Sequence, residues 1–159
     1  MKALTLTQPW ATLVAIGEKQ IETRSWNTRY RGPLAIHAAK KFPASAKDIC
    51  LKEPFFSVLR REELAGVGTG SGWISVDFPL GAIVATCELV HVKKIDELTH
   101  FSSCCAVAWQ SRSWQLDAQE RAFGDYSIGR YMWLLKNVVM LPEPIPAKGA
   151  LSFWEWGGA

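Results

Sequence analysis

The sequence has no long apolar run, and this absence argues against a membrane-spanning helix. A helix that crosses a bilayer needs about 20 consecutive apolar residues, and no stretch of the chain approaches that length. Residues 1–7 contain too short an apolar stretch for a secretory signal peptide, and they alternate in the manner of a strand. We therefore expect a cytoplasmic protein that makes no membrane contact.

Cysteine and histidine are also scarce, with four and three residues. The cysteines show no C-x-x-C spacing and the histidines lie far apart, so neither set has the spacing of a structural zinc site. We expect no metal and no other cofactor. In a reducing compartment the thiols should behave as small apolar side chains. The residues concerned are Cys50, Cys87, Cys104, Cys105, His37, His91 and His100.

Internal repeats, low-complexity segments and linkers are missing as well. The chain has 159 residues, of which 48% are hydrophobic and 21% charged, so it is long enough for one core and too apolar for a disordered protein. These proportions predict a single domain over residues 1–159.

Positive charge is concentrated in one segment. Residues 19–41 carry six positive side chains and one negative one, a local charge of +5, whereas the whole chain has a net charge of +3 and its remainder therefore −2. Such a concentration is typical of a site for phosphate groups, and it is also compatible with an ordinary solvated face. The charged residues are Lys19, Glu22, Arg24, Arg29, Arg31, Lys40 and Lys41.

The periodicity of apolar residues predicts short strands mixed with short helices. Alternation favours strands at 2–7, 21–25, 34–39, 81–93 and 130–139. Helical spacing favours helices over 9–17, 44–64 with a break at Pro54, 96–110 and 117–123. Without regular βαβ spacing, this order indicates an α+β fold, a small mixed β-barrel with short flanking helices. The glycines at 66–72 predict a surface loop, with a phosphate cradle or lid as the alternative.

The segment 17–26 contains the most informative pattern. Period two places Glu22, Arg24 and Trp26 on one face of a strand, with Lys19 just before it. Lys19 and Arg24 can contact phosphate, Glu22 can accept from a base amino group, and Trp26 offers a stacking plane. The alternative is a structural Glu22–Arg24 ion pair beneath an edge tryptophan.

Other candidates flank this segment or follow a later helix. Gln8 and Trp10 open the first helix and are predicted at the cleft, with core packing as the alternative for Trp10. Arg31 and Lys40 can extend a phosphate track, and Ser127 and Arg130 are predicted at the cleft rim.

Two ordered groups of residues make the sequence resemble the ASCH domain family, in particular its small prokaryotic or phage-type members. Together the groups span nearly the whole chain. The first group consists of three segments, Leu6-Thr7-Gln8-Pro9-Trp10-Ala11, Gly17-x-Lys19-x-x-Glu22-x-Arg24-Ser25-Trp26 and Arg31-Gly32-Pro33-Leu34-Ala35-Ile36-His37-Ala38. The second group is Glu120-x-x-Phe123-Gly124-Asp125-Tyr126-Ser127-x-Gly129-Arg130-Tyr131-x-Trp133.

The resemblance implies a PUA-like barrel and binding of single-stranded RNA, a nucleotide or a nucleoside in a basic cleft beside the G-x-K-x-x-E-x-R motif. The alternative is an enzyme, because some ASCH proteins are similar to amidohydrolases of N4-acylated cytidine, and ribonuclease activity in the same cleft is a further option. The implied catalytic residues would be Lys19, Thr23 and Glu120. The threonine of the amidohydrolase pattern falls at position 22, which is Glu22 here, with Thr23 beside it. Glu120 also has a structural interpretation, because Asp117 to Glu120 resembles a helix capping box.

Overall fold

The computed structural model describes residues 1–62, 64–67, 74–96, 106–109 and 112–157. The helices are α1 (Trp10–Ala15), α2 (Ala44–Ile49), α3 (Phe55–Arg61) and α5 (Ala118–Ala122). The strands are β1 (Lys2–Leu6), β2 (Ile21–Arg24), β3 (Gly32–Ala38), β4 (Ala65–Val67), β5 (Ile74–Val76), β6 (Ala82–Lys94), β7 (Ala106–Trp109), β8 (Arg112–Gln115), β9 (Tyr131–Pro146) and β10 (Phe153–Glu155).

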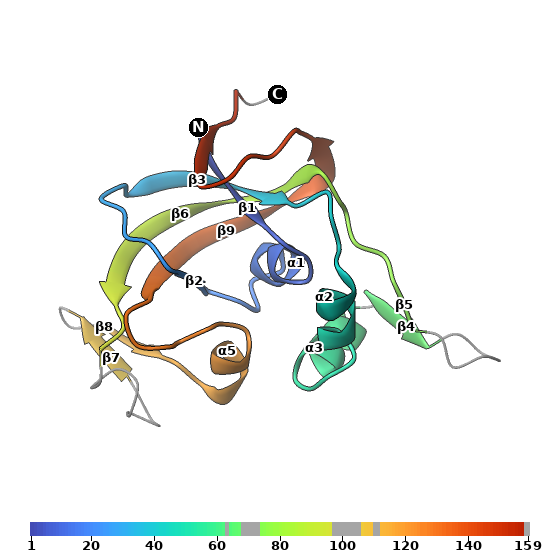
Figure 1. Cartoon of the computed structure of the whole chain (residues 1–159), viewed down its shortest axis with the longest axis horizontal. Helices are drawn as coiled ribbons and strands as arrows, with labels where there is room; N and C mark the ends of the chain where they lie inside the picture. The colour runs from blue at the N-terminus through green and yellow to red at the C-terminus, as the bar shows by residue number, and fades with distance from the viewer. Residues whose placement is uncertain (63, 68–73, 97–105, 110–111, 158–159) are drawn as a thin grey trace.

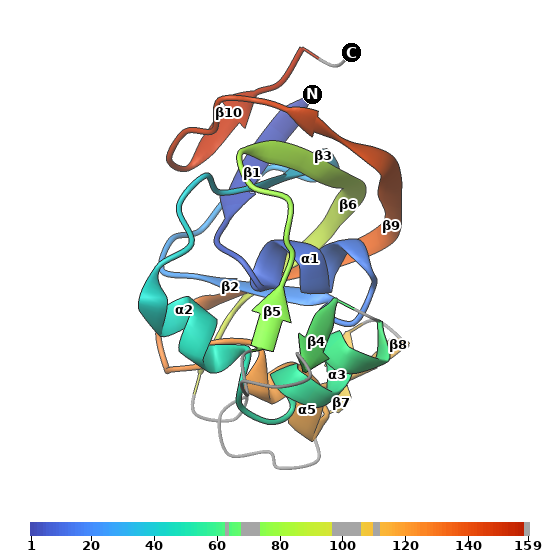
Figure 2. The same ribbon diagram turned by 90° about the vertical axis from the view of Figure 1, so that its right-hand side faces the viewer.

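Six strands form one strongly curved sheet in the order β10-β1-β3-β6-β9-β2. The β1–β3 pair is parallel and the other pairs are antiparallel, so the sheet is mixed. Irregular register along the long β6–β9 pair accompanies this curvature, as bulges bend a sheet. The sheet curls into a half-barrel around α1 (Figures 1 and 2). The predicted α+β fold of the PUA-like type is confirmed.

The main core fills the space between the concave face of the sheet and α1. Leu4, Ile36, Leu89 and Trp133 are almost completely buried there, and Val14 of α1 packs against the same cluster. A second cluster lies on the other side of α1 and attaches α2 and α3; it contains Leu13, Cys50, Phe55, Val58, Leu59, Phe78 and Phe123. Burial of these side chains fixes α1 between the sheet and the α2–α3 pair (Figure 2).

Two elements differ from the prediction. Residues 106–109, expected in a helix over 96–110, form strand β7, which pairs with β8. The apolar run there is too short to distinguish the period of a helix from that of a strand, and pairing with β8 stabilises the strand. Residues 97–105 lie outside the described residues. The predicted loop at 66–73 begins inside β4, which pairs with β5, and residues 68–73 also lie outside the described part.

Strand β9 extends to Pro146, beyond the predicted end at residue 139. Only its first four residues pair with β2, whereas the pairing with β6 runs from Tyr131 to Pro146. Proline cannot donate to a ladder, so prolines are tolerated where one side of a strand has no partner. The break at Pro54 is confirmed, since it separates α2 from α3.

The two described cysteines, Cys50 and Cys87, are buried as free thiols. Burial raises the pKa of Cys50 to about 11 and that of Cys87 to about 12, so both act as small apolar side chains at neutral pH. Within the described ranges, no helix combines the length and apolarity needed to span a bilayer.

Candidate functional site

Strand β2 lies at one edge of the curved sheet, and side chains complete the hydrogen bonding of its outer side. The Ile21 N–H donates to Glu120 Oε1 at 3.2 Å, and the Gln20 N–H donates to Glu120 Oε2 at 2.7 Å. The Thr23 carbonyl accepts from Arg130 Nη2 at 3.3 Å. Charged side chains along an edge prevent pairing with another chain, so this arrangement protects the strand.

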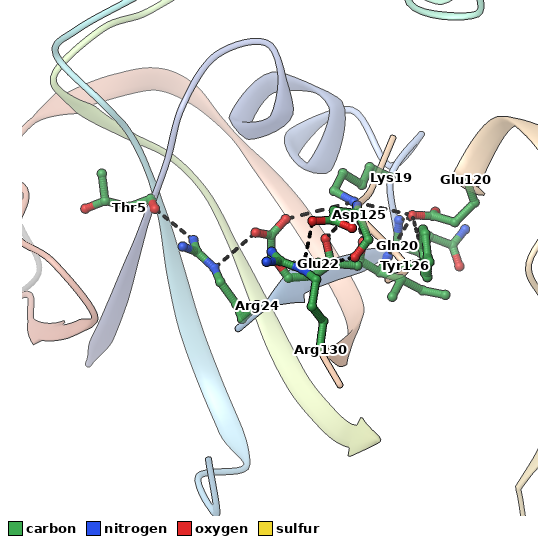
Figure 3. Close-up of polar contacts among 11 residues, drawn as sticks. Thr5, Lys19, Gln20, Glu22, Arg24, Glu120, Asp125, Tyr126 and Arg130 are labelled. Atoms are coloured by element: carbon green, nitrogen blue, oxygen red, sulfur yellow. Dashed lines mark hydrogen bonds and ion pairs between the residues drawn. The ribbon is translucent and has the colours of Figure 1, made fainter. Parts of the chain in front are cut away.

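Lys19 lies inside this edge structure. Gly17, with φ +82°, turns the chain after α1 and directs the next residues toward β2. The Lys19 residue is 0% exposed, and its ammonium donates to the Ile21 carbonyl. Its Nζ also lies 3.6 Å from Glu120 Oε1 and 3.9 Å from Glu22 Oε2 (Figure 3). Two carboxylates and a carbonyl therefore compensate one buried positive charge.

Glu22 is held from its other side by Arg24. The Arg24 Nε lies 3.0 Å from Glu22 Oε1 as an ion pair, although it is not aligned as a hydrogen bond. Arg24 Nη2 donates to the Thr5 carbonyl at 2.9 Å, so this guanidinium joins β2 to the end of β1 (Figure 3). Glu22 and Arg24 thus share one face of β2, as period two predicts, and the carboxylate is fixed by two cations.

Glu120 reaches the cluster from α5. The Asp117 side chain caps this helix by accepting from the Glu120 N–H at 2.7 Å, which confirms the N-terminal half of the predicted capping box. The Glu120 carboxylate is turned toward β2, and the Tyr126 hydroxyl donates to it at 3.4 Å. Burial raises the pKa of Glu120, while Lys19 and the N–H groups of Gln20 and Ile21 oppose that rise.

A pocket of about 470 Å³ opens beside this cluster, and its size suits a small organic ligand. Among the predicted site residues it is lined by Trp10, Glu22 and Thr23. Trp10 packs edge-on against Phe55, with ring centroids 6.1 Å apart. Sequence reasoning missed the rest of the lining, which is Ile49, Lys52, Glu53, Phe55, Ala122, Phe123, Gly124 and Asp125.

The lining carries more negative than positive charge. Glu22, Glu53 and Asp125 contribute three carboxylates, and Lys52 is the single positive side chain among the lining residues described. Hydrogen bonds from Ser127 lower the pKa of Asp125, which favours its ionised form. The positive side chains of segment 19–41 are therefore not among the lining residues described for this pocket, and the basic cleft stays a prediction.

The remaining predicted binding residues lie elsewhere in the described structure. Gln8 is completely buried; its Nε2 donates to the Pro79 carbonyl and its Oε1 accepts from the Thr12 N–H. Trp26 packs against Trp133 of the core, with ring centroids 4.5 Å apart. These contacts hold Gln8 and Trp26 within the fold, and a binding role stays a prediction for both.

The other four predicted residues are more exposed, and the described pocket lining does not include them. Arg31 donates to the carbonyls of Thr28 and Tyr30 in its own loop. Lys40 follows β3 and lies beside Gly81. Ser127 and Arg130 both contact Asp125 of the pocket wall, with Arg130 Nε 3.2 Å from Asp125 Oδ2. Ser127 and Arg130 thus position the rim, while Arg31 and Lys40 stay predictions.

The sequence contained some signal for the missed lining residues. The second group of ASCH-like residues includes Phe123, Gly124 and Asp125. Their spacing did not show that they line the pocket. Lys52 and Glu53 precede the helix break at Pro54 and carry no such signal. In the parts of the chain that are described, no three His, Cys, Asp or Glu side chains are grouped to hold a metal ion.

Comparison with known proteins confirms the resemblance to the ASCH domain family. The family model of the ASCH domain matches residues 4–128. Activating signal cointegrator 1 of Mus musculus is 31% identical over 152 residues, which cover 96% of this chain and 22% of the mouse protein. Activating signal cointegrator 1 of Homo sapiens is 31% identical over 87 residues, which cover 55% of this chain and 13% of the human protein. The chain thus spans about a fifth or less of the length of these relatives. It belongs to the ASCH domain family.

Proposed function

We propose that this ASCH domain binds a nucleotide unit, free or within single-stranded RNA, with the base inside the pocket beside Glu22. The observation that carries the proposal is the placement of the Glu22 carboxylate. Glu22 is 8% exposed and lines the pocket, and its carboxylate pairs with Arg24 at 3.0 Å and with Lys19 at 3.9 Å. A buried acceptor held in one orientation suits recognition of a base edge.

The apolar walls support the same function. Trp10, Phe55 and Phe123 line the pocket, and aromatic planes bind bases of any sequence by stacking. Lys52 is exposed at the lining and is the residue available there for a backbone phosphate. The association of the ASCH family with nucleic acids agrees with this use of the pocket.

The test is binding of short single-stranded RNA to the variant Trp10→Leu, which keeps an apolar side chain near Phe55 but removes the stacking plane. We expect a loss of about 1–3 kcal/mol in binding free energy, the usual contribution of one stacked base. Trp156→Leu is the matched control, because Trp156 packs at the other end of the sheet beside Trp154 and is not among the described lining residues. Unchanged affinity in folded Trp10→Leu would contradict the proposal.

Hydrolysis is the second candidate, because Lys19 and Glu120 form an ion pair close to the pocket and Thr23 lines it. In the amidohydrolase interpretation these three residues would act on N4-acylated cytidine, and a ribonuclease would use the same group. Burial of the Lys19 ammonium against Ile21, Glu22 and Glu120 favours a structural role, since a nucleophile must reach its substrate.

Turnover assays separate the two functions. Wild-type protein is incubated with N4-acetylcytidine and with short RNA, and products are followed over time. We expect binding without turnover. Robust hydrolysis by the wild type that is lost in Lys19→Arg, with the variant folded, would replace the binding proposal with the enzyme, because arginine cannot act as a neutral nucleophile.

A further inference from the structure

The charge of the pocket restricts which part of a nucleotide can enter it. Three of its walls present carboxylates, from Glu22 on β2, Glu53 before α3 and Asp125 before β9. The single described lysine of the lining, Lys52, is exposed. Lys19 and Arg24 pair with Glu22, and Arg130 pairs with Asp125, but these three cations are not among the lining residues described. A ligand in the pocket therefore meets mainly acceptor oxygens, which disfavour a phosphate dianion and favour a group that donates hydrogen bonds.

Glu22 is the acceptor best placed to select such a group. A carboxylate presents acceptor oxygens, and ion pairs with Arg24 and Lys19 hold this one in one orientation. The surrounding pocket wall is apolar at Trp10 and Phe55, so an unmatched polar group brought against it would lose its water without compensation.

From these observations we infer that the pocket selects a base bearing an exocyclic amino group and holds its phosphate outside, with Glu22 as the specificity-determining residue. The inference rests on the proposed function of the pocket. An amino group donates to the carboxylate, whereas the carbonyl oxygen that replaces it in uracil or hypoxanthine faces the carboxylate as a second acceptor. Selection thus comes from attraction of one base and repulsion of the other.

The experiment measures binding of nucleosides by isothermal titration in two matched pairs, cytidine against uridine and adenosine against inosine. Within each pair the main change is amino to carbonyl. We expect the amino-bearing nucleoside to bind about 5- to 150-fold more tightly, the range that one good base contact provides. Each 5′-monophosphate should bind within about fivefold of its nucleoside, because an exposed pair with Lys52 contributes little.

Two variants locate the selectivity. Glu22→Gln keeps the shape of the side chain but adds a donor, so the ratio within each pair should fall to near one. Glu53→Gln removes one negative charge from the rim without changing the buried cluster. It should keep the ratio within each pair and improve binding of the monophosphates. Thermal melting shows whether each variant is folded. If Glu22→Gln does not fold, the inference is tested by the wild-type ratios and by the binding of monophosphates to Glu53→Gln.

The outcomes separate this inference from the proposed function. Equal binding of both members of each pair, or tight binding of monophosphates with none of the nucleosides, overturns the inference and leaves a base- or phosphate-binding pocket. Selectivity that survives in folded Glu22→Gln also overturns it, because another residue would then be responsible. Absence of binding by every nucleoside, nucleotide and RNA overturns the proposed function itself.

Discussion

Replacement of Lys19 by methionine should strongly destabilise the domain. Methionine retains most of the apolar stem, so the main loss is the ammonium. That loss removes the cation 3.6 Å from Glu120 Oε1 and 3.9 Å from Glu22 Oε2, and leaves the Ile21 carbonyl without this donor. Breaking a buried ion pair from one side costs about 3–5 kcal/mol. A domain of this size has a total stability of only about 5–15 kcal/mol.

The destabilisation should depend on pH in a defined direction. Burial already raises the pKa of Glu120 and Lys19 opposes that rise, so removing Lys19 raises the pKa further. In the unfolded chain a glutamate titrates near about 4.3. A folded pKa above that value favours the protonated form in the fold, so stability is lost as pH rises through the folded pKa. The effect of Lys19→Met should therefore be smaller at pH 5 than at pH 8.

Urea unfolding followed by tryptophan fluorescence measures this difference at both pH values. Lys41→Met is the matched control, because Lys41 is exposed, and its change should stay within about 0.5 kcal/mol. The reasoning is refuted if Lys19→Met costs less than about 1 kcal/mol at pH 8, far below the usual penalty for an uncompensated buried charge. It is also refuted if the cost is larger at pH 5 than at pH 8.

Two further predictions concern His37 and its surroundings. A Cβ at Gly149 would lie 2.3 Å from His37 Cε1, so Gly149→Ala should lower stability in urea by about 1–3 kcal/mol, while Gly157→Ala, with nothing within 4 Å, should not. Burial lowers the pKa of His37, partly offset by its hydrogen bond to the Ala147 carbonyl, so the folded state resists protonation. Stability should then be lost as pH falls below about 6.5, the pKa of histidine in the unfolded chain. His37→Gln should reduce that loss between pH 7 and pH 5. An equally steep loss in His37→Gln would mean that other groups cause it.

Local patterns predicted the part of the site that lies within one strand. Alternation along residues 21–25 placed Glu22 and Arg24 on one face, and the structure joins them by an ion pair at 3.0 Å. Trp26 stays on the same side although β2 ends at Arg24, because its ring packs on Trp133, the cross-strand neighbour of Glu22. Alternation predicts the side on which a residue lies but not what packs against it, so the stacking role of Trp26 stays a prediction.

The charge pattern was less informative because neighbours in sequence are not neighbours in space. Lys19 turns inward after α1, Arg31 lies in a loop and Lys40 lies beyond the end of β3. The carboxylates of Glu53 and Asp125 come from segments about 70 residues apart, and tertiary packing brings them to one pocket. The local composition of the chain does not show which distant residues meet in the fold. An acidic pocket in a positively charged protein was therefore not predictable from the sequence.

The edge position of β2 explains why a conspicuous charged motif need not be the group that contacts a ligand. An edge strand leaves main-chain groups unpaired, and burying them requires hydrogen-bonding side chains. Lys19 donates to the Ile21 carbonyl, and Glu120 accepts from the Ile21 N–H. Both charged side chains are therefore buried and not available at the surface. Glu22, which pairs with Lys19, is the member of this charged cluster that lines the pocket. Changes at Lys19 should therefore act first on stability, whereas ligand choice should depend on Glu22 and on the walls at residues 52–55 and 122–125.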